Sequence, residues 1–526
     1  MNKSFIKLLC KFRRIIINRN NNKLTKYLGE LYYSYCKIYR ILLKIAILST
    51  FLLLSNNNYL FTQEENEEEL YAIYQLRVVK KIIIVGNLDT DTDQIINFLY
   101  TKEGEIFKAN KFAKDLQRLR NTSLFYRVKA KLKPISVNDL EITLLVEDRW
   151  TLLPIISFDT SVPKYEVGLY DLNFLGQMFE IGGSYKNEQE QNYYSFWYLD
   201  QSFLGTKVPL SFIIFRSGVI DTYYDLNNPN REIAKFKHVA NGGFIESGRN
   251  VYDNFRWLLR YTWYSEKIER QSGGTLLPID DSQETLDLWN QIEDEQRKLM
   301  TIKNSSNLIS GLLTLNFIFG HLNIFDNYII RGWEIQMVIS HSDTLLGSFE
   351  TYNQSFIMGR YFFSLADFNI GMRLCAASKT TRNLNYDFSL GGFILNEVVT
   401  GQNTTSGTST LRGFNPTQFH GNNFYYGTFE LRYPLIDSDD VPFLQAVVIQ
   451  TTAFVDYGYI WNGSFYNHQK TFKDIYASSG AGATFILKKV ANAMLRFQIA
   501  IPLNPMLKDY SGNPEFKIIF GSTQHF

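Results

Sequence analysis

The sequence predicts a transmembrane β-barrel of about 16 antiparallel strands, preceded by one small α+β domain with the element order β-α-α-β-β. Three observations support this fold class. An apolar segment near the N-terminus predicts export. Strand-like runs rich in aromatic residues recur from Trp150 to Phe526, and the chain contains 33 Tyr and 41 Phe. This pattern continues for about 375 residues, which exceeds one soluble sandwich and suits ~16 strands with their loops.

Residues 1–63 are expected to be a signal or targeting segment, followed by an acidic linker. They contain 11 basic residues and one acidic residue, Glu30. Residues 41–55 are apolar except for Lys44. This run is shorter than the ~20 residues of a membrane-spanning helix but suits the hydrophobic region of a signal peptide. An uncleaved membrane anchor is the alternative interpretation.

The composition of the remaining chain excludes several function classes. Residues 64–526 carry 43 basic and 51 acidic residues, so no basic surface for nucleic acid is expected. Cys375 is the one cysteine after residue 63 and has no partner for a disulfide within the mature chain. The six His residues form no metal-ligand pattern, and no nucleophile, Walker or dinucleotide motif is present. We therefore expect no enzyme activity, no cofactor and no metal.

The small α+β domain is expected over residues 76–149. Apolar residues at helical spacing and β-branched runs bounded by turn residues predict its elements. These are a strand over 78–87, helices over 91–104 and 108–125, and strands over 126–134 and 139–148.

This element order, with "IIIVGN" (82–87), "KDLQRLRNTSLFYRV" (114–128) and "LLVED" (144–148) in these places, resembles a POTRA domain. POTRA domains are the periplasmic modules of outer-membrane assembly and secretion barrels. An edge strand of such a sheet has unpaired backbone groups and can accept a peptide by strand addition. A plain spacer is the alternative. Only one such unit fits before Trp150.

The clearest barrel strand is "NFRWLLRYTWY", residues 254–264. One face carries the apolar residues Phe255, Trp257, Leu259, Tyr261 and Trp263, and the other carries Asn254, Arg256, Arg260 and Thr262. A barrel strand between lipid and a wet lumen needs this pattern. A soluble sandwich would give the same alternation with the aromatic face buried. Residues 266–307 are too polar for a strand and predict a long extracellular loop.

The C-terminal strand carries apolar residues at one parity. These are Phe516, Ile518, Phe520 and Phe526. A terminal aromatic residue on an alternating strand resembles the signal by which bacterial outer-membrane barrels are recognised for insertion. Ser522 and Gln524 depart from the pattern.

Five motifs follow one another toward the C-terminus. They are "LRGF" (411–414), "GTFELRYPL" (427–435), "FVDYGYIW" (454–461), "SSGAGATF" (478–485) and "LRFQIAIPL" (495–503). This ordered series resembles the surface-antigen barrel of the BamA/TamA outer-membrane assembly superfamily, and with the POTRA unit the resemblance covers nearly everything after residue 75. It implies a sixteen-stranded barrel in which an extracellular loop folds back into the lumen. Leu411, Arg412, Gly413 and Phe414 form the tip of that loop.

Strand parity predicts partners for Arg412 independently of the resemblance. In 427–435 the apolar positions face lipid, which turns Glu430 inward, and the same reasoning places Asp456 and Gly458 in the lumen. A guanidinium can hold carboxylates bidentately. In the family pattern the loop arginine pairs with the aspartate of the strand motif, here Asp456 in the motif that begins at Phe454. An exposed loop arginine is the alternative.

The resemblance implies an outer-membrane assembly or translocation factor. Its partners would be unfolded outer-membrane or secreted client proteins, periplasmic chaperones or accessory subunits, and outer-membrane lipid. A client would be received by POTRA strand addition and would leave through a seam between the first and last barrel strands. A passive outer-membrane pore or structural surface protein, or a dedicated two-partner-type secretion transporter, are the alternatives. The expected location is the bacterial outer membrane, with the POTRA domain in the periplasm.

Overall fold

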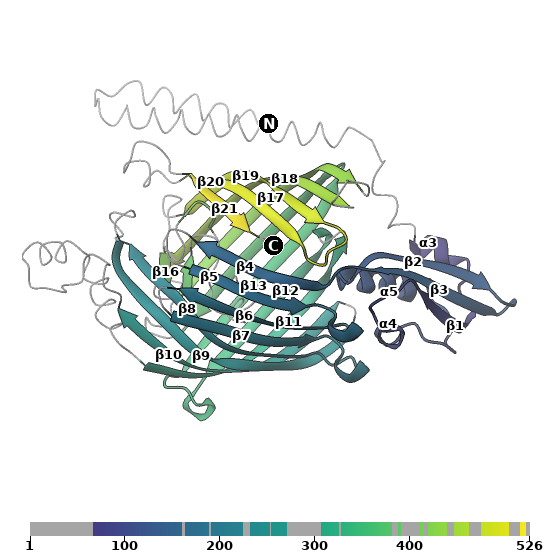
Figure 1. Cartoon of the computed structure of the whole chain (residues 1–526), viewed down its shortest axis with the longest axis horizontal. Helices are drawn as coiled ribbons and strands as arrows, with labels where there is room; N and C mark the ends of the chain where they lie inside the picture. The colour runs from purple at the N-terminus through teal and green to yellow at the C-terminus, as the bar shows by residue number, and fades with distance from the viewer. Residues whose placement is uncertain are drawn as a thin grey trace, which may run out of the picture. The chain divides into compact units, whose positions relative to one another are not determined.

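The computed structural model describes residues 67–159, 164–188, 191–224, 232–252, 254–270, 307–325, 328–380, 388–390, 411–414, 419–438, 446–461, 475–503 and 516–521. The expected signal segment, residues 271–306 of the expected loop and Phe526 lie outside these residues. The prediction of a loop over 266–307 is wrong at its ends, because residues 266–270 continue the strand Phe255–Arg270 and Asn307 begins the strand Asn307–Phe325. The backbone pairing with the neighbouring strand continues past the last apolar residues, although the side chains there are polar. The described strands form a three-stranded, a 16-stranded and a two-stranded sheet (Figure 1). Within the described part of the chain, no helix has both the length and the apolar character needed to cross a membrane.

The N-terminal domain, residues 67–149, contains three helices and three strands. In order they are α3 (Glu67–Ala72), β1 (Val78–Val85), α4 (Thr92–Phe98), α5 (Ala109–Asn121), β2 (Phe125–Pro134) and β3 (Asp139–Asp148). Helix α4 begins where the Asp91 carboxylate accepts a hydrogen bond from the N–H of Asp93, which satisfies one free donor of the first turn. The predicted β-α-α-β-β order is confirmed.

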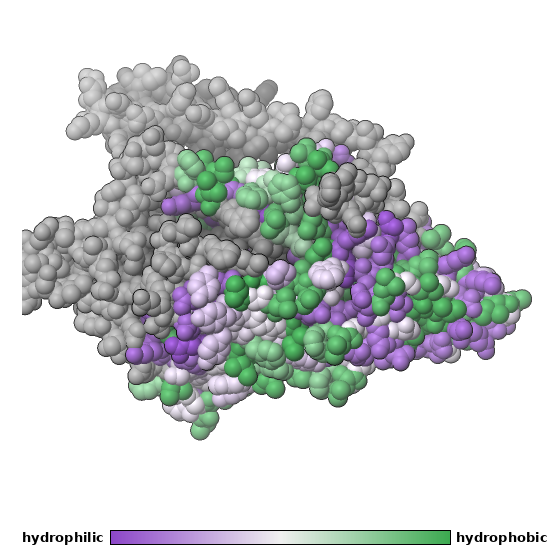
Figure 2. Space-filling model, in the orientation of Figure 1, coloured by the Kyte–Doolittle hydropathy of each residue, from purple (hydrophilic) through white to green (hydrophobic). Residues whose placement is uncertain are grey.

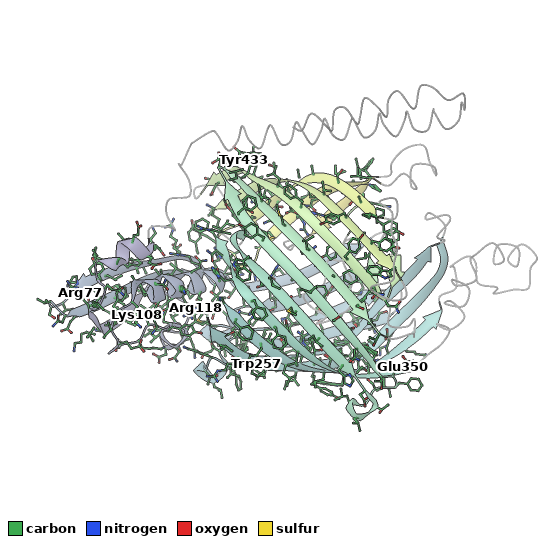
Figure 3. The ribbon with its side chains drawn as sticks, turned by 180° about the vertical axis from the view of Figure 1, so that it is seen from behind. Arg77, Lys108, Arg118, Trp257, Glu350 and Tyr433 are labelled. Carbon is green, nitrogen blue, oxygen red and sulfur yellow. The ribbon has the colours of Figure 1, made fainter. Side chains whose placement is uncertain are left out.

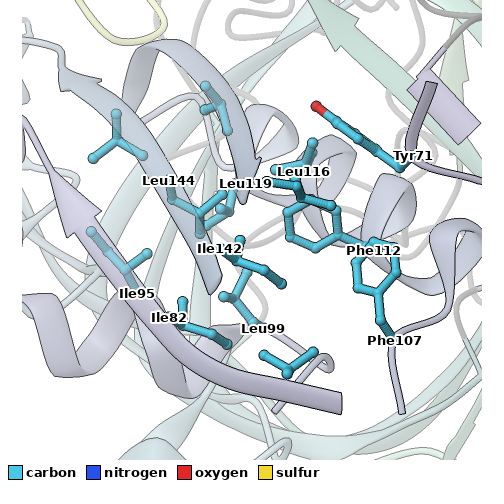
Figure 4. Packing of buried hydrophobic residues seen from close by; sticks show 14 of the residues in the cluster. Tyr71, Ile82, Ile95, Leu99, Phe107, Phe112, Leu116, Leu119, Ile142 and Leu144 are labelled. Carbon is cyan, nitrogen blue, oxygen red and sulfur yellow. The ribbon is translucent and has the colours of Figure 1, made fainter. Parts of the chain in front are cut away.

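The core of this domain lies between the helices and one face of the sheet. The strand order is β1-β3-β2, with β1 parallel and β2 antiparallel to β3. Phe112, Leu116 and Leu119 recur at helical spacing on α5 and are fully buried. They pack into one cluster with Ile142 and Leu144 of β3 (Figure 4). On the other face of the sheet, the side chains of Lys129 and Lys131 on β2 are exposed.

Helix α3 occupies residues for which the sequence predicted an acidic linker. Its three glutamates lie in the first turn, where negative charge favours a helix N-terminus. Tyr71 is buried in the domain core and contacts the ring of Phe112, with ring centroids 5.4 Å apart. Glu67 also receives two hydrogen bonds from Arg120 of α5, at 3.1 and 2.7 Å. The domain therefore begins earlier than the predicted strand.

The 16-stranded sheet is antiparallel throughout, and its neighbours follow chain order. Its strands are β4 (Leu152–Asp159), β5 (Lys164–Asp171), β6 (Phe179–Glu188), β7 (Gln191–Asp200), β8 (Leu210–Tyr224), β9 (Glu232–Tyr252), β10 (Phe255–Arg270), β11 (Asn307–Phe325), β12 (Tyr328–Ser342), β13 (Tyr352–Leu365), β14 (Phe368–Lys379), β17 (Asn423–Ser438), β18 (Val447–Trp461), β19 (Tyr476–Leu487), β20 (Met494–Pro502) and β21 (Lys517–Gly521). The short strands β15 (Phe388–Leu390) and β16 (Phe419–Gly421) pair with each other. Trp257 and Tyr433 lie toward one end of the long strands and Glu350 toward the other (Figure 3).

Burial along the strands distinguishes a membrane barrel from a soluble sandwich. In β20 the apolar residues Leu495, Phe497 and Ile499 are exposed, whereas Arg496 and Gln498 between them are buried. A soluble sandwich would bury the apolar residues instead. The same inversion holds in β10, where Leu259, Tyr261 and Trp263 are exposed. Figure 2 shows green patches of hydrophobic residues on the visible face of the barrel, among pale residues of intermediate hydropathy. The prediction of a transmembrane β-barrel is confirmed.

Candidate functional site

The residues Leu411–Phe414, which we call the tip segment, lie inside the barrel against the inner faces of β17 to β20. Arg412 is fully buried. Its Nε and Nη2 donate to the two carboxylate oxygens of Asp456 on β18, at 2.7 and 2.8 Å. The backbone N–H of Arg412 donates to the same carboxylate at 3.1 Å. This bidentate arrangement uses the planar fork of the guanidinium, which a lysine lacks.

The remaining guanidinium nitrogen contacts two further strands. Arg412 Nη1 donates to Glu430 Oε2 on β17 at 3.0 Å and to Gln498 Oε1 on β20 at 3.2 Å. The other oxygen of Glu430 accepts from Nε of Arg432 at 2.8 Å. One arginine from the loop therefore joins side chains of β17, β18 and β20, which lie among the last strands before β21.

An aromatic ring supports the guanidinium from its flat side. The Cζ of Arg412 lies 3.4 Å from the ring centroid of Phe454 on β18. A cation over an aromatic face is attracted by the ring quadrupole, more strongly where water is excluded. Gly480 on β19 leaves room for this ring, because a Cβ there would lie 2.4 Å from Phe454 Cζ. Phe454 and Gly480 thus form a platform for Arg412.

The flanking residues of the tip segment are packed as a small apolar core. Leu411 and Phe414 are buried at 0% and 3% exposure in a cluster that includes Phe424 and Tyr426. Gly458 makes space for Leu411, since a Cβ there would lie 3.2 Å from Leu411 Cδ2 and 2.9 Å from Tyr426 Cβ. These contacts fix the segment on both sides of the arginine.

Gly413 turns the chain between Arg412 and Phe414. Its φ is +96°, in the region that L-residues with a side chain adopt only with strain. A Cβ at this position would also lie 3.2 Å from Ser478 Cβ on β19. Glycine is therefore required by backbone conformation and by close approach to the strand.

The charges around the tip segment are mostly basic. Four arginines are at least nine-tenths buried near it on the inner side, namely Arg373, Arg412, Arg432 and Arg496. Glu430 and Asp456 are the carboxylates that hold Arg412. The hydrogen bonds of Arg412 to Asp456, Glu430 and Gln498 tie the tip segment to three strands of the barrel wall. We call these four residues the lumen latch.

The structure brings together Arg412, Asp456 and Glu430, the group that parity and the family pattern predicted, and it adds Gln498 as a partner. Alternation within "LRFQIAIPL" was the signal that could have placed Gln498 inward. Phe454 was identified as part of a motif, but its role under the guanidinium is a structural finding.

Three residues of the expected insertion signal lie within or directly before β21, the last described strand. Phe516 precedes β21 and Ile518 lies within it, and both are largely exposed, at 61% and 71%. Phe520 belongs to β21, whereas Phe526 falls outside the described residues.

Comparisons with known proteins agree with this architecture. A POTRA family model, described as a surface antigen variable number repeat, matches residues 78–149, and the Omp85 superfamily domain model matches residues 173–526. A protein of Treponema pallidum (strain Nichols), described as an outer membrane protein assembly factor, is 25% identical over 251 residues. That match covers 41% of this chain and 29% of the relative, so the chain spans less than a third of the relative's length.

One solved structure shares the fold at low sequence identity. CdiB from Escherichia coli superimposes with a TM-score of 0.52 at 13% identity, over 85% of this chain and 76% of that chain. BamA from Haemophilus ducreyi lacking POTRA domains 1–3 gives a TM-score of 0.46 at 16% identity, over 84% of each chain. Because the Omp85 model matches more than half of the sequence, the chain belongs to the Omp85 superfamily of outer-membrane β-barrel proteins, with one POTRA domain before the barrel.

Proposed function

We propose that this barrel inserts or exports client polypeptides, with its POTRA domain in the periplasm, and that it does so without enzymatic chemistry. The observation that carries the proposal is the position of β2 at the edge of the POTRA sheet. A strand at a sheet edge presents backbone donors and acceptors along one side, and an extended client segment can pair with them.

The backbone direction of β2 supports this role. The carbonyl of Val128 accepts a hydrogen bond from Arg120 Nη2 at 3.1 Å, so it points away from β3. In an antiparallel pair, the N–H and C=O of one residue point to the same side, and this direction alternates along the strand. Ala130 and Leu132 therefore direct their N–H and C=O groups to the same side as Val128, away from β3.

The opposite edge of the sheet is occupied by the chain itself. The N–H of Val79 on β1 donates to the Glu105 carbonyl at 2.9 Å, and the Val79 carbonyl accepts from Gly104 at 2.7 Å. Ile82 donates its N–H to the Glu103 carboxylate at 2.7 Å. These contacts cover much of β1, so the edge formed by β2 is the better receptor for a client strand.

The side chains of β2 indicate which strands it would favour. Val128 and Leu132 are buried on the helix side of the sheet. Arg127, Lys129, Lys131 and Lys133 are exposed on the opposite side. A client strand added here would place alternate side chains beside the apolar positions and beside the cations. Strands with an apolar face and a polar or acidic face, as barrel proteins contain, fit this edge.

The barrel would receive the client at the ends of its sheet. β4 and β21 are the two terminal strands in the strand order. A seam between them is the natural place for a further strand to enter, because the other strands each have a neighbour on both sides. In this scheme the latch at Arg412 holds β17 to β20 together as one unit while β4 and β21 separate and pair with the client strand.

A cross-linking experiment tests the receptor edge. A photoreactive residue at the exposed position Lys131 should capture client proteins in intact cells. Ala130→Pro removes one outward N–H from the edge and should abolish capture, because proline cannot donate to an added strand. Ala130→Thr keeps the N–H and should leave capture intact.

Barrel insertion is the control. It should be the same in the protein labelled at Lys131 and in its Ala130→Pro and Ala130→Thr variants. Equal capture by the proline variant would contradict strand addition and would favour the alternative that the POTRA domain is a plain spacer. Absence of any client adduct in the unsubstituted background would favour a passive pore.

A further inference from the structure

Two turns between barrel strands share an unusual conformation. The first joins β5 to β6 through "DLNFLGQ" (171–177), and the second joins β7 to β8 through "DQSFLGT" (200–206). In each, the aspartate accepts a hydrogen bond from the N–H two residues later, at 2.9 and 2.8 Å. Each then forms a short 3-10 helix, η1 (Phe174–Gly176) and η2 (Phe203–Gly205). We call these two segments the twin turns.

Each twin turn holds a leucine in a strained and exposed position. Leu175 has φ 53° and ψ 27°, and Leu204 has φ 52° and ψ 35°. This left-handed region is unfavourable for residues with a Cβ other than Asn and Asp. The two side chains are 78% and 83% exposed. A fold that twice strains its backbone to expose the same large apolar side chain points to a surface that covers it.

One side of the twin turns is already occupied by the POTRA domain. The carbonyl of Gly176 accepts from the N–H of Asp91, the N-cap of α4, at 2.9 Å. Asn173 Nδ2 donates to Thr90 Oγ1 at 2.8 Å. At the second turn, a Cβ on Gly205 would lie 3.4 Å from Asn97 Nδ2 of α4. Both turns therefore contact α4, while their leucines remain exposed to the surroundings.

The other side of the twin turns continues the membrane-facing surface of the barrel. The ring of Phe174 in η1 lies 5.8 Å from the ring of Phe179, which lies 5.0 Å from Tyr198. Tyr198 stacks on Phe212 at 5.4 Å. On the strands, Phe179, Tyr198 and Phe212 lie on the same face as the exposed residues Phe196 and Ile214. They form an aromatic row across β6, β7 and β8, of the kind found where barrels meet the membrane interface.

The second turn is connected to the same row through a polar contact. The Tyr198 hydroxyl donates to Asp200 Oδ2 at 2.9 Å, and Asp200 begins the second turn. A tyrosine with its ring in the apolar layer and its hydroxyl bound at the rim is typical of an interface position. Hydrophobic residues also appear in Figure 2 at the rim beside the POTRA domain. Leu175 directly follows Phe174 of this row, and Leu204 lies four residues after Asp200.

We propose that Leu175 and Leu204 are paired lipid anchors, which insert into the acyl region of the membrane leaflet on the POTRA side. Phospholipid is the occupant because the leucines continue an aromatic row that already faces lipid. The same turns hold α4, so anchoring them in the membrane also fixes the orientation of the POTRA domain against the bilayer. A client bound to β2 would then be held at a defined angle to the barrel.

Spin-label accessibility tests the anchors. The full chain with Cys10, Cys36 and Cys375 replaced by Ala is reconstituted in phospholipid vesicles and labelled at Leu175→Cys or Leu204→Cys. Two reference positions are Val137→Cys, 85% exposed in the distal POTRA hairpin, and Leu259→Cys on the barrel exterior. Both anchor labels should collide more often with oxygen than with a water-soluble nickel chelate, as at Leu259, with the ratio reversed at Val137. Labels that behave as at Val137, or that are shielded from both reagents by protein, would overturn the proposal.

A second variant separates lipid anchoring from the shape of the turns. Leu175→Asn with Leu204→Asn keeps a residue that tolerates the left-handed conformation but removes the apolar side chains. Distances between labels at Val137 and at Leu345, in the loop after β12, report the orientation of the POTRA domain. The distance distribution should be narrow in the parent protein in vesicles and broader in the double variant. Equal widths would show that the leucines do not orient the domain.

Discussion

Replacing Arg412 by alanine removes the centre of the lumen latch. The substitution deletes the hydrogen bonds from Nε and Nη2 to Asp456 and from Nη1 to Glu430 and Gln498. It also removes the cation from the ring of Phe454. Glu430 keeps Arg432, whereas among the described residues the fully buried carboxylate of Asp456 keeps only the backbone N–H of residue 412. Most of the free-energy cost of the substitution therefore arises at Asp456, whose buried charge loses its cation.

The size of the effect follows from this burial. Deleting one partner of a buried ion pair costs about 3–5 kcal/mol, because the other charge stays desolvated without compensation. Since 1.36 kcal/mol is a factor of ten, ~3 kcal/mol shifts the equilibrium toward an undocked tip segment by about a hundredfold. The strands of the barrel keep their backbone ladders, so abundance and insertion should be near normal.

Protease cleavage of intact cells measures undocking. Leu411 and Phe414 are buried in the native protein, so an added protease that cuts after large apolar residues should not cut there. In Arg412→Ala it should cut after Leu411 or Phe414. Arg260→Ala is a matched control, because it also removes a lumen-side pair, with Glu246 at 3.0 Å, but leaves the tip segment intact.

A double-mutant cycle sharpens the same prediction. Asp456→Ala should give the same cleavage, and the double variant should add little, because both changes remove one interaction. Client assembly should fall in all three variants. Strict additivity, or a native cleavage pattern in Arg412→Ala, would refute the latch and leave an ordinary loop arginine.

Three further changes test other parts of the structure. Gly458→Ala places a Cβ 3.2 Å from Leu411 Cδ2 and should weaken docking of the tip segment by about 1–3 kcal/mol, measured by the same protease assay. Asp148→Ala removes a carboxylate that accepts three backbone N–H groups and one hydroxyl from the loop after β1. It should destabilise the POTRA domain by about 2 kcal/mol in denaturant unfolding, and an unchanged midpoint would contradict this. Arg149→Ala removes the bond to the Lys488 carbonyl at 2.6 Å and should speed amide exchange in the β19–β20 turn, whereas unchanged exchange would show that this contact is dispensable.

Strand alternation and the family resemblance together made the latch predictable from the amino-acid sequence. Asp456 and Arg412 are 44 residues apart, but the parity of one strand fixes which side chains enter the lumen. The aromatic content and the ordered motifs likewise identified the barrel and its family. Strand alternation is a local periodicity, which a single sequence displays directly, whereas the family was identified by the resemblance of the motifs.

Three other features could not be predicted from local periodicity, because they depend on contacts distant in sequence or on backbone conformation. Phe454 supports Arg412 only because Gly480 on the neighbouring strand leaves space, and such a match requires knowledge of the register. Helix α3 was hidden because its acidic first turn has the composition of a linker, while a single buried residue, Tyr71, ties it to the core. The strain at Leu175 and Leu204 is a backbone property that composition does not reveal.

The central claim, that this barrel assembles or exports other proteins, is tested most directly by depleting it and quantifying the outer-membrane proteome. We expect specific client proteins to disappear from the outer membrane before growth changes. Their recovery should follow expression of the native chain but not of Ala130→Pro or Arg412→Ala. An outer-membrane proteome unchanged by depletion would contradict the claim and indicate a passive pore or a structural surface protein.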